Sequence, residues 1–158
     1  MSKEVSIIQK KNIMNLIDDK HLVAIEKAIA ENDLSYLTNE QRVAYYNAVC
    51  ESVGLNPLTQ PFAYIKLNGK ITLYARKECS EQLRKLNLIS TQIVSQTINA
   101  DFIDVHTRAS DKSGRIEEDF ASVYIGGLKG HDLANAKMKA VTKGKRRVTL
   151  AISGLDIS

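Results

Sequence analysis

The chain has 158 residues, of which 44% are hydrophobic and 25% are charged, so its composition is that of an ordinary globular domain and excludes a disordered or fibrous protein. Its net charge of +4 is too small to indicate a polyanionic partner unless the cations are clustered. No apolar run approaches the roughly 18 residues that span a bilayer, and the first residues lack the layout of a signal peptide. We therefore expect a cytoplasmic protein with no membrane partner, in which Cys50 and Cys79 are reduced, buried thiols.

The first third of the chain has the periodicity of helices. Three apolar residues recur at helical spacing, namely Leu22, Ile25 and Ile29. Asp19 precedes them and is predicted to cap the first helix. Thr38 and Gln41 match a capping box at the start of a second helix, which Gly54 is predicted to end. We expect an N-terminal helical segment over residues 1–37 and a core over residues 38–158.

A β-hairpin is predicted where segments 62–67 and 70–75 flank Asn68-Gly69, the residue pair that best tolerates the positive φ of a type I′ turn. A two-residue loop sets four cross-strand pairs: Lys66 with Ile71, Tyr64 with Leu73, Ile65 with Thr72, and Ala63 with Tyr74. Both faces are fairly apolar, so we expect the hairpin to be covered on both sides or joined to a neighbour.

A helix, a sheet and a final helix are predicted after the hairpin. The helix covers residues 76–86. Three strands follow, over residues 91–97, 102–109 and 115–125, with turn-forming residues at 111–114. The Gly-rich segment 126–130 leads into a last helix over about residues 131–148. The order is N-terminal helices, β-hairpin, helix, three-stranded antiparallel meander with one buried face, and long C-terminal basic helix, which is an α+β fold.

Positive charge is concentrated in the final helix and its approach. Seven basic residues accompany one acid, Asp132: Lys129, Lys137, Lys139, Lys143, Lys145, Arg146 and Arg147. At about 100° per residue, Lys139, Lys143 and Arg146 fall opposite the apolar face. Such a stripe neutralises phosphates and releases their counterions, which favours nucleic acid without reading its sequence. The alternative is a solvated face whose charges stabilise the helix C-terminus.

Two neighbouring features have open alternatives. Lys137 falls within the apolar face, so it either reaches the surface, pairs with Glu117 or Glu118, or reaches into a groove. The segment Gly127-Leu128-Lys129-Gly130 either presents backbone N–H groups to a phosphate at the start of the helix or is an ordinary turn.

A second basic and aromatic group surrounds the hairpin. Its members are Tyr64, Lys66, Lys70, Tyr74, Arg76 and Lys77. Aromatic rings interleaved with cations suit a single strand, whose bases stack while its phosphates are neutralised. Alternatively, both tyrosines are core or edge residues of the sheet.

Catalytic signatures are sparse, so we expect no enzyme activity and no cofactor. The three histidines, His21, His106 and His131, lie on different elements, and no metal-ligand spacing or nucleophile motif occurs. The alternative is a nuclease that holds a divalent ion with the carboxylates at 117–119, although exposed strand ends explain these acids equally well.

Three stretches carry a family resemblance: GLNP at 54–57, YIKLNGK at 64–70 with YARK at 74–77, and ANAKMKAVTKGKRRVTL at 134–150. They resemble the phage recombinases of the RecT/Red-beta group, over roughly residues 40–155. The basic helix followed by Arg-Arg-Val-Thr-Leu is the most specific part of the similarity.

The resemblance implies ATP-independent binding and annealing of complementary single strands of DNA in phage homologous recombination. It implies a homo-oligomer, a ring or helical filament, that holds single-stranded DNA and the annealed duplex intermediate along a positive groove, with a phage exonuclease as a candidate partner in a bacterial host cell. By position, phosphates would contact Lys139, Lys143, Arg146 and Arg147. The opposite wall would contain Lys66, Lys70, Arg76 and Lys77. Further candidate DNA-binding residues are Lys129, Lys137 and Tyr74.

The chain also departs from the larger members of this group. It ends four residues after Gly154 and leaves no room for the C-terminal domain that recruits single-strand-binding protein in longer relatives, so either this is a minimal version or the chain is truncated. The remaining alternative for function is a DNA- or RNA-binding module that does not anneal strands.

Overall fold

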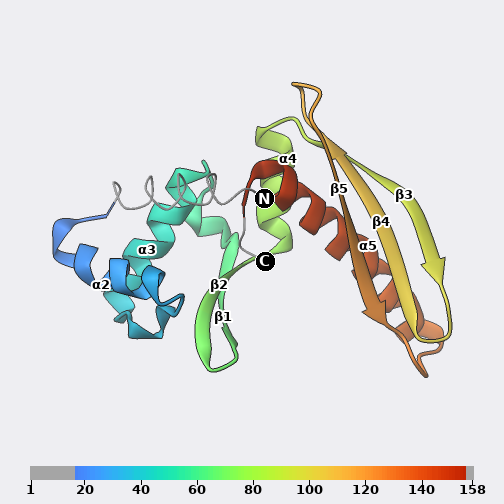
Figure 1. Cartoon of the computed structure of the whole chain (residues 1–158), viewed down its shortest axis with the longest axis horizontal. Coiled ribbons are helices and arrows are strands. Elements are labelled where there is room, and N and C mark those ends of the chain that lie inside the picture. The colour runs from blue at the N-terminus through green and yellow to red at the C-terminus, as the bar shows by residue number, and fades with distance from the viewer. Residues whose placement is uncertain (1–16, 156–158) are drawn as a thin grey trace. The chain divides into compact units, whose positions relative to one another are not determined.

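The computed structural model describes residues 17–155, which adopt an α+β fold as predicted (Figure 1). These residues form two compact units, one that runs to Cys79 and one that begins at Ser80. The predicted boundary between residues 37 and 38 lies inside the first unit. The first 16 residues of the predicted N-terminal segment, and the last three of the predicted core, lie outside the described residues.

The first unit begins with two helices, α2 (Asp19–Ala30) and α3 (Asn39–Ser52), separated by the 3₁₀ turn η1 (Leu34–Tyr36). The predicted cap of α2 is wrong by one position: Asp18 is the N-cap, without a side-chain bond, and Asp19 is already helical. The capping box is confirmed, because Gln41 N–H donates to Thr38 Oγ1 at 3.2 Å and Thr38 N–H donates to Gln41 Oε1 at 2.9 Å. Gly54 follows the end of α3 with φ +75°.

The hairpin is formed by β1 (Phe62–Leu67) and β2 (Lys70–Ala75), which follow the 3₁₀ turn η2 (Pro57–Thr59). All four predicted cross-strand pairs are confirmed. Asn68 and Gly69 have φ values of +52° and +77°, as a type I′ turn requires. The two strands form a sheet of their own.

The second unit is a three-stranded antiparallel sheet with a helix on one face. Helix α4 (Lys77–Leu86) crosses the boundary between the units and precedes β3 (Ser90–Ile98), β4 (Phe102–Ser110) and β5 (Ile116–Tyr124). The strand order is β3-β4-β5. Helix α5 (Gly130–Ser153) lies across one face of this sheet (Figure 1). It extends five residues beyond the predicted end, because Thr149, Leu150 and Ile152 remain buried.

Small side chains bring α5 against the sheet. Its buried residues on that side recur every four positions: Ala136, Ala140, Gly144, Val148 and Ile152. They pack on the buried face of β4, where Ile103, Val105, Thr107 and Ala109 are inaccessible to solvent. Over the described part of the chain, no helix is both long enough and apolar enough to cross a bilayer.

Candidate nucleic-acid interface

The buried row of α5 determines where its cations lie. Ala136, Ala140 and Gly144 face the sheet, so residues three positions further on, Lys139, Lys143 and Arg147, share an adjacent flank of the helix. They are spaced by four positions and are therefore neighbours along the helix surface. The flank is the one beside β5, since Lys143 and Arg147 both contact that strand.

Two cations of this row are held by β5. Lys143 Nζ donates to the backbone oxygen of Ser122 at 3.2 Å. Arg147 pairs with the carboxylate of Asp119, with 3.3 Å from Nε to Oδ2 and 3.4 Å from Nη2 to Oδ1. Lys139 is exposed to solvent. Sequence periodicity placed Lys143 opposite the sheet, whereas the structure places it at the β5 edge.

The remaining cations of the predicted stripe are spread around α5. Arg146 and Lys145 are half-buried. Lys137 is exposed, in agreement with the alternative in which it reaches the surface. Its two predicted carboxylate partners are engaged elsewhere, because Glu117 lies 4.0 Å from Arg115 and Glu118 is paired with Arg108.

The Gly-rich approach to α5 leaves the start of the helix open. Lys129 is the N-cap residue and makes no side-chain capping bond. Gly127 and Gly130 have positive φ values of 79° and 57°, a conformation that glycine adopts at little cost. The segment 127–130 is exposed, so the first N–H groups of the helix, at the positive end of its dipole, face solvent.

The hairpin group belongs to the first unit, where its cations and its tyrosines have different roles. Lys66, Lys70 and Lys77 are exposed. Arg76 donates to the backbone oxygen of Gln60 at 3.1 Å. Tyr74 is half-buried.

Tyr64 has a structural role. Its hydroxyl donates to the backbone oxygen of Arg42 at 2.7 Å, which ties β1 to α3. Burial raises the pKa of Tyr64 above its usual value. The structural alternative is therefore supported for this residue.

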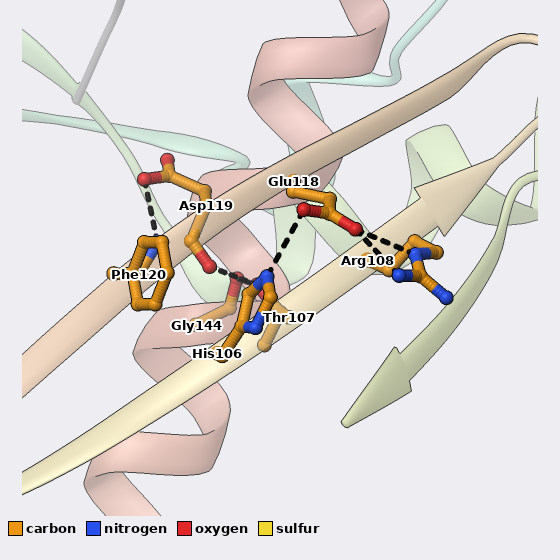
Figure 2. A network of polar contacts seen from close by, with 7 residues as sticks. All are labelled: His106, Thr107, Arg108, Glu118, Asp119, Phe120 and Gly144. Atoms are coloured by element: carbon orange, nitrogen blue, oxygen red, sulfur yellow. Dashed lines mark hydrogen bonds and ion pairs between the residues drawn. The ribbon is translucent and has the colours of Figure 1, made fainter. Parts of the chain in front are cut away.

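The three consecutive acids of β5 do not converge on one point. Successive residues of a strand point to opposite faces, so Glu118 lies on the face away from α5 while Asp119 points toward the helix. Figure 2 shows Glu118 between Arg108, at 2.6 Å, and His106, at 3.2 Å. Hydrogen bonds from these residues, Arg108 first, lower the pKa of Glu118. Within residues 17–155, no group of three His, Cys, Asp or Glu residues is arranged to hold a metal ion.

The sequence did not predict the aromatic residues on the open face of the sheet. Phe120 and Tyr124 are 61% and 64% exposed. Phe120 stacks on His106 with ring centroids 4.4 Å apart, and Phe102 meets Tyr124 edge-on at 5.5 Å. The sequence of β5 does contain an indication of these exposed rings. Apolar residues occur at positions that point to both faces of the strand, so some of them must lie on the open face.

The role of Arg84 on α4 was not predicted either. Its Nη1 donates to Thr149 Oγ1 at 3.1 Å, and burial lowers its pKa. Thr149 in turn donates to the backbone oxygen of Lys145 at 2.6 Å. Arg84 therefore helps to hold the C-terminal half of α5, and nothing local in the sequence marks that contact.

No protein-family model matches this chain, and no curated protein matches it significantly.

Proposed function

We propose that the chain binds single-stranded DNA and anneals complementary strands without ATP, as an oligomer, in phage homologous recombination in the cytoplasm of a bacterial host cell. The observation that carries the proposal is the cationic row Lys139, Lys143 and Arg147 on a helix whose other side is packed on a sheet. The resemblance of segments 54–77 and 134–150 to RecT/Red-beta proteins supports the same assignment.

The proposed mechanism needs only charge neutralisation and a rigid support. Two DNA strands repel each other through their phosphates, and cations that neutralise these phosphates lower that repulsion. The contacts of Lys143 and Arg147 with β5 hold two of the three cations in one orientation, so these two side chains lose little entropy when DNA binds. Base pairing then supplies the free energy of annealing, which requires neither nucleotide hydrolysis nor a catalytic residue.

An annealing assay with fluorescent complementary oligonucleotides, in the absence of nucleotide, tests this proposal. We expect the wild type to accelerate annealing and the Lys139→Ala/Lys143→Ala variant to lose the acceleration while remaining folded. The matched control is Lys85→Ala/Lys112→Ala, which removes the same charge at two exposed positions outside α5. Equal loss in both variants would contradict a site on α5, and no acceleration by the wild type would contradict annealing.

The second candidate function is a single-strand binding module without annealing activity. The exposed rings of Phe120 and Tyr124 favour it, because stacking of a base on an aromatic ring contributes about 1–3 kcal/mol per base and tolerates any sequence. Under this function, the wild type binds single strands but leaves the annealing rate unchanged, and Phe120→Ala/Tyr124→Ala weakens binding.

A further inference from the structure

The free edge of β3 differs from every other strand edge in the described chain. Its nine residues, Ser90–Ile98, contain no charged residue, no proline and no glycine. Most of them are exposed, including Val94 at 38% and Ile98 at 49%. Natural sheets usually protect an edge of this length with charges, prolines or a covering segment. In Figure 1, β3 forms the outer edge of the sheet, with β4 on its other side.

The other edge of the same sheet is blocked by side chains. In β5, the outward N–H of Phe120 donates to Asp119 Oδ1 at 2.7 Å, which Figure 2 shows. Two residues further on, the outward backbone oxygen of Ser122 accepts from Lys143. Because these groups already have partners, another strand cannot pair along this part of β5.

The two edges of the hairpin are blocked in the same way and also carry lysines. Both backbone groups of Phe62 in β1 bond to the hydroxyl of Tyr46, at 2.8 and 3.0 Å. The N–H of Ile71 in β2 donates to Asp33 Oδ1 at 3.1 Å. Lys66 lies in β1 and Lys70 in β2. Among residues 17–155, β3 is thus the one edge strand with neither a charge nor a side-chain bond to its outward backbone groups.

The pairing of β3 with β4 shows which backbone groups are available. Asn99 N–H donates to Phe102 O at 3.0 Å, so hydrogen-bonded and non-bonded residues alternate from that point back along β3. Gln96 and Ile98 therefore direct their N–H and C=O groups to the free edge. A β-bulge at Val94 separates this run from residues 90–93.

We propose that β3 pairs in antiparallel orientation with β3 of a second copy of this chain, across a two-fold axis near Val94, so that two sheets join into one. An identical strand is the fitting partner because an uncharged edge meets no like charge when it faces itself. The other described edges are blocked by the bonds above. A two-fold contact of this kind is self-complementary and closes as a dimer.

The bulge agrees with this arrangement. A bulge bends its strand and interrupts the ladder, so two copies pair best through the regular runs on either side of it. Before the bulge, Thr91 and Ile93 face Ala109 and Thr107, whose backbone groups bond β5, so Thr91 and Ile93 direct their own groups to the free edge. An axis between Val94 and Ser95 sets Ile93 of one copy beside Gln96 of the other, and Thr91 beside Ile98. The partly exposed Val94 then lies next to the axis.

The first test introduces like charges along β3 and measures molecular mass by sedimentation equilibrium without DNA, over a wide range of protein concentration. In the proposed dimer, Gln92 of one copy faces Thr97 of the other, and both are exposed. We expect the wild type to be a dimer, and both Gln92→Lys/Thr97→Lys and Gln92→Glu/Thr97→Glu to have half its mass. An equimolar mixture of the two variants is expected to regain the dimer, because opposite charges then face each other. The control Ala30→Lys/Ala134→Lys adds the same charge at exposed helix positions and is expected to remain a dimer.

The second test uses a cysteine at the proposed axis. Cys50 and Cys79 are fully buried, so in the folded Val94→Cys protein the new thiol is the accessible one among residues 17–155. We expect mild oxidation to convert this variant to a disulfide-linked dimer and to leave the wild type uncrosslinked.

Three results would overturn the proposal: a monomeric wild type at all concentrations, assembly of the lysine variant equal to that of the wild type, or no crosslink at position 94. The measurements need no DNA, so the proposal can fail while strand annealing holds, and the reverse.

Discussion

Gly144 allows α5 to lie directly against β4. A Cβ atom at this position would lie 2.8 Å from Thr107 Cγ2, and the Thr107 hydroxyl is shared between the backbone oxygens of Gly144 and Asp119, at 3.1 Å each (Figure 2). Overpacking a core costs about 1–3 kcal/mol, whereas alanine gains about 1 kcal/mol over glycine in a helix. We expect Gly144→Ala to lower the free energy of unfolding by up to about 2 kcal/mol, measured by urea denaturation.

The same contact provides the control. Thr107→Ser keeps the hydroxyl and removes Cγ2, the atom that the new methyl group would meet. We therefore expect Gly144→Ala/Thr107→Ser to be more stable than the two single changes predict when added together. Additive changes would show that the clash is not the cause.

The carboxyl group of Asp33 makes the stability of the folded protein depend on pH. Hydrogen bonds from Ser35, and then from the backbone of Ile71, lower the pKa of its carboxyl below the usual 3.8. A carboxyl whose pKa is lower in the folded state stabilises the protein above its unfolded-state pKa, and this contribution is lost as the pH falls through the folded-state value. We expect wild type and Asp33→Asn to differ most in free energy of unfolding near neutral pH and to converge in strong acid. A difference independent of pH would contradict the assignment.

At the scale of elements, the hairpin shows what local sequence can predict. Its bounds and register follow from Asn68-Gly69 and a period of two, which are properties of neighbouring residues. The end of α5 was predicted less well, because it depends on contacts such as the bond from Arg84 to Thr149, 65 positions away. Burial by distant segments has no local signature, so periodicity alone ended this helix too early.

The candidate site was predictable to a similar extent. The sequence showed that α5 is basic and has one apolar side, and both follow from spacing. It did not show that Lys143 and Arg147 contact β5, because their partners are 21 and 28 positions away. Lys143 was predicted on the far face of α5 and lies instead at the β5 edge, again because its contact is with a residue distant in sequence.

The hairpin turn gives a prediction at this scale. Nothing lies within 4 Å of a Cβ built on Gly69, and its φ is +77°, so the cost of a side chain there comes from the backbone alone. Left-handed conformation costs an L-residue about 1–2 kcal/mol, and we expect Gly69→Ala to destabilise the protein by that amount in urea denaturation. Asn68→Gly keeps a residue that tolerates positive φ, so a comparable loss in that variant would contradict the explanation.

For the whole molecule, the distribution of its charge matters more than the net value of +4. The logarithm of the affinity for a single strand falls with the logarithm of the salt concentration, by about 0.7 for each phosphate neutralised. We expect Lys139→Ala/Lys143→Ala to reduce that slope by about 1.4, as fits two lost contacts. Fluorescence anisotropy across a salt series measures it, and an unchanged slope would place the bound strand elsewhere.

The cations on α5 form one line. Lys139, Lys143 and Arg147 follow a helix row inclined by about 26° to the axis, in which neighbouring Cβ atoms are about 5–6 Å apart. A single line of charge can follow one sugar–phosphate backbone at a time. The row of one chain therefore serves one strand of an annealing pair, and the second strand is held by base pairing or by the row of another copy.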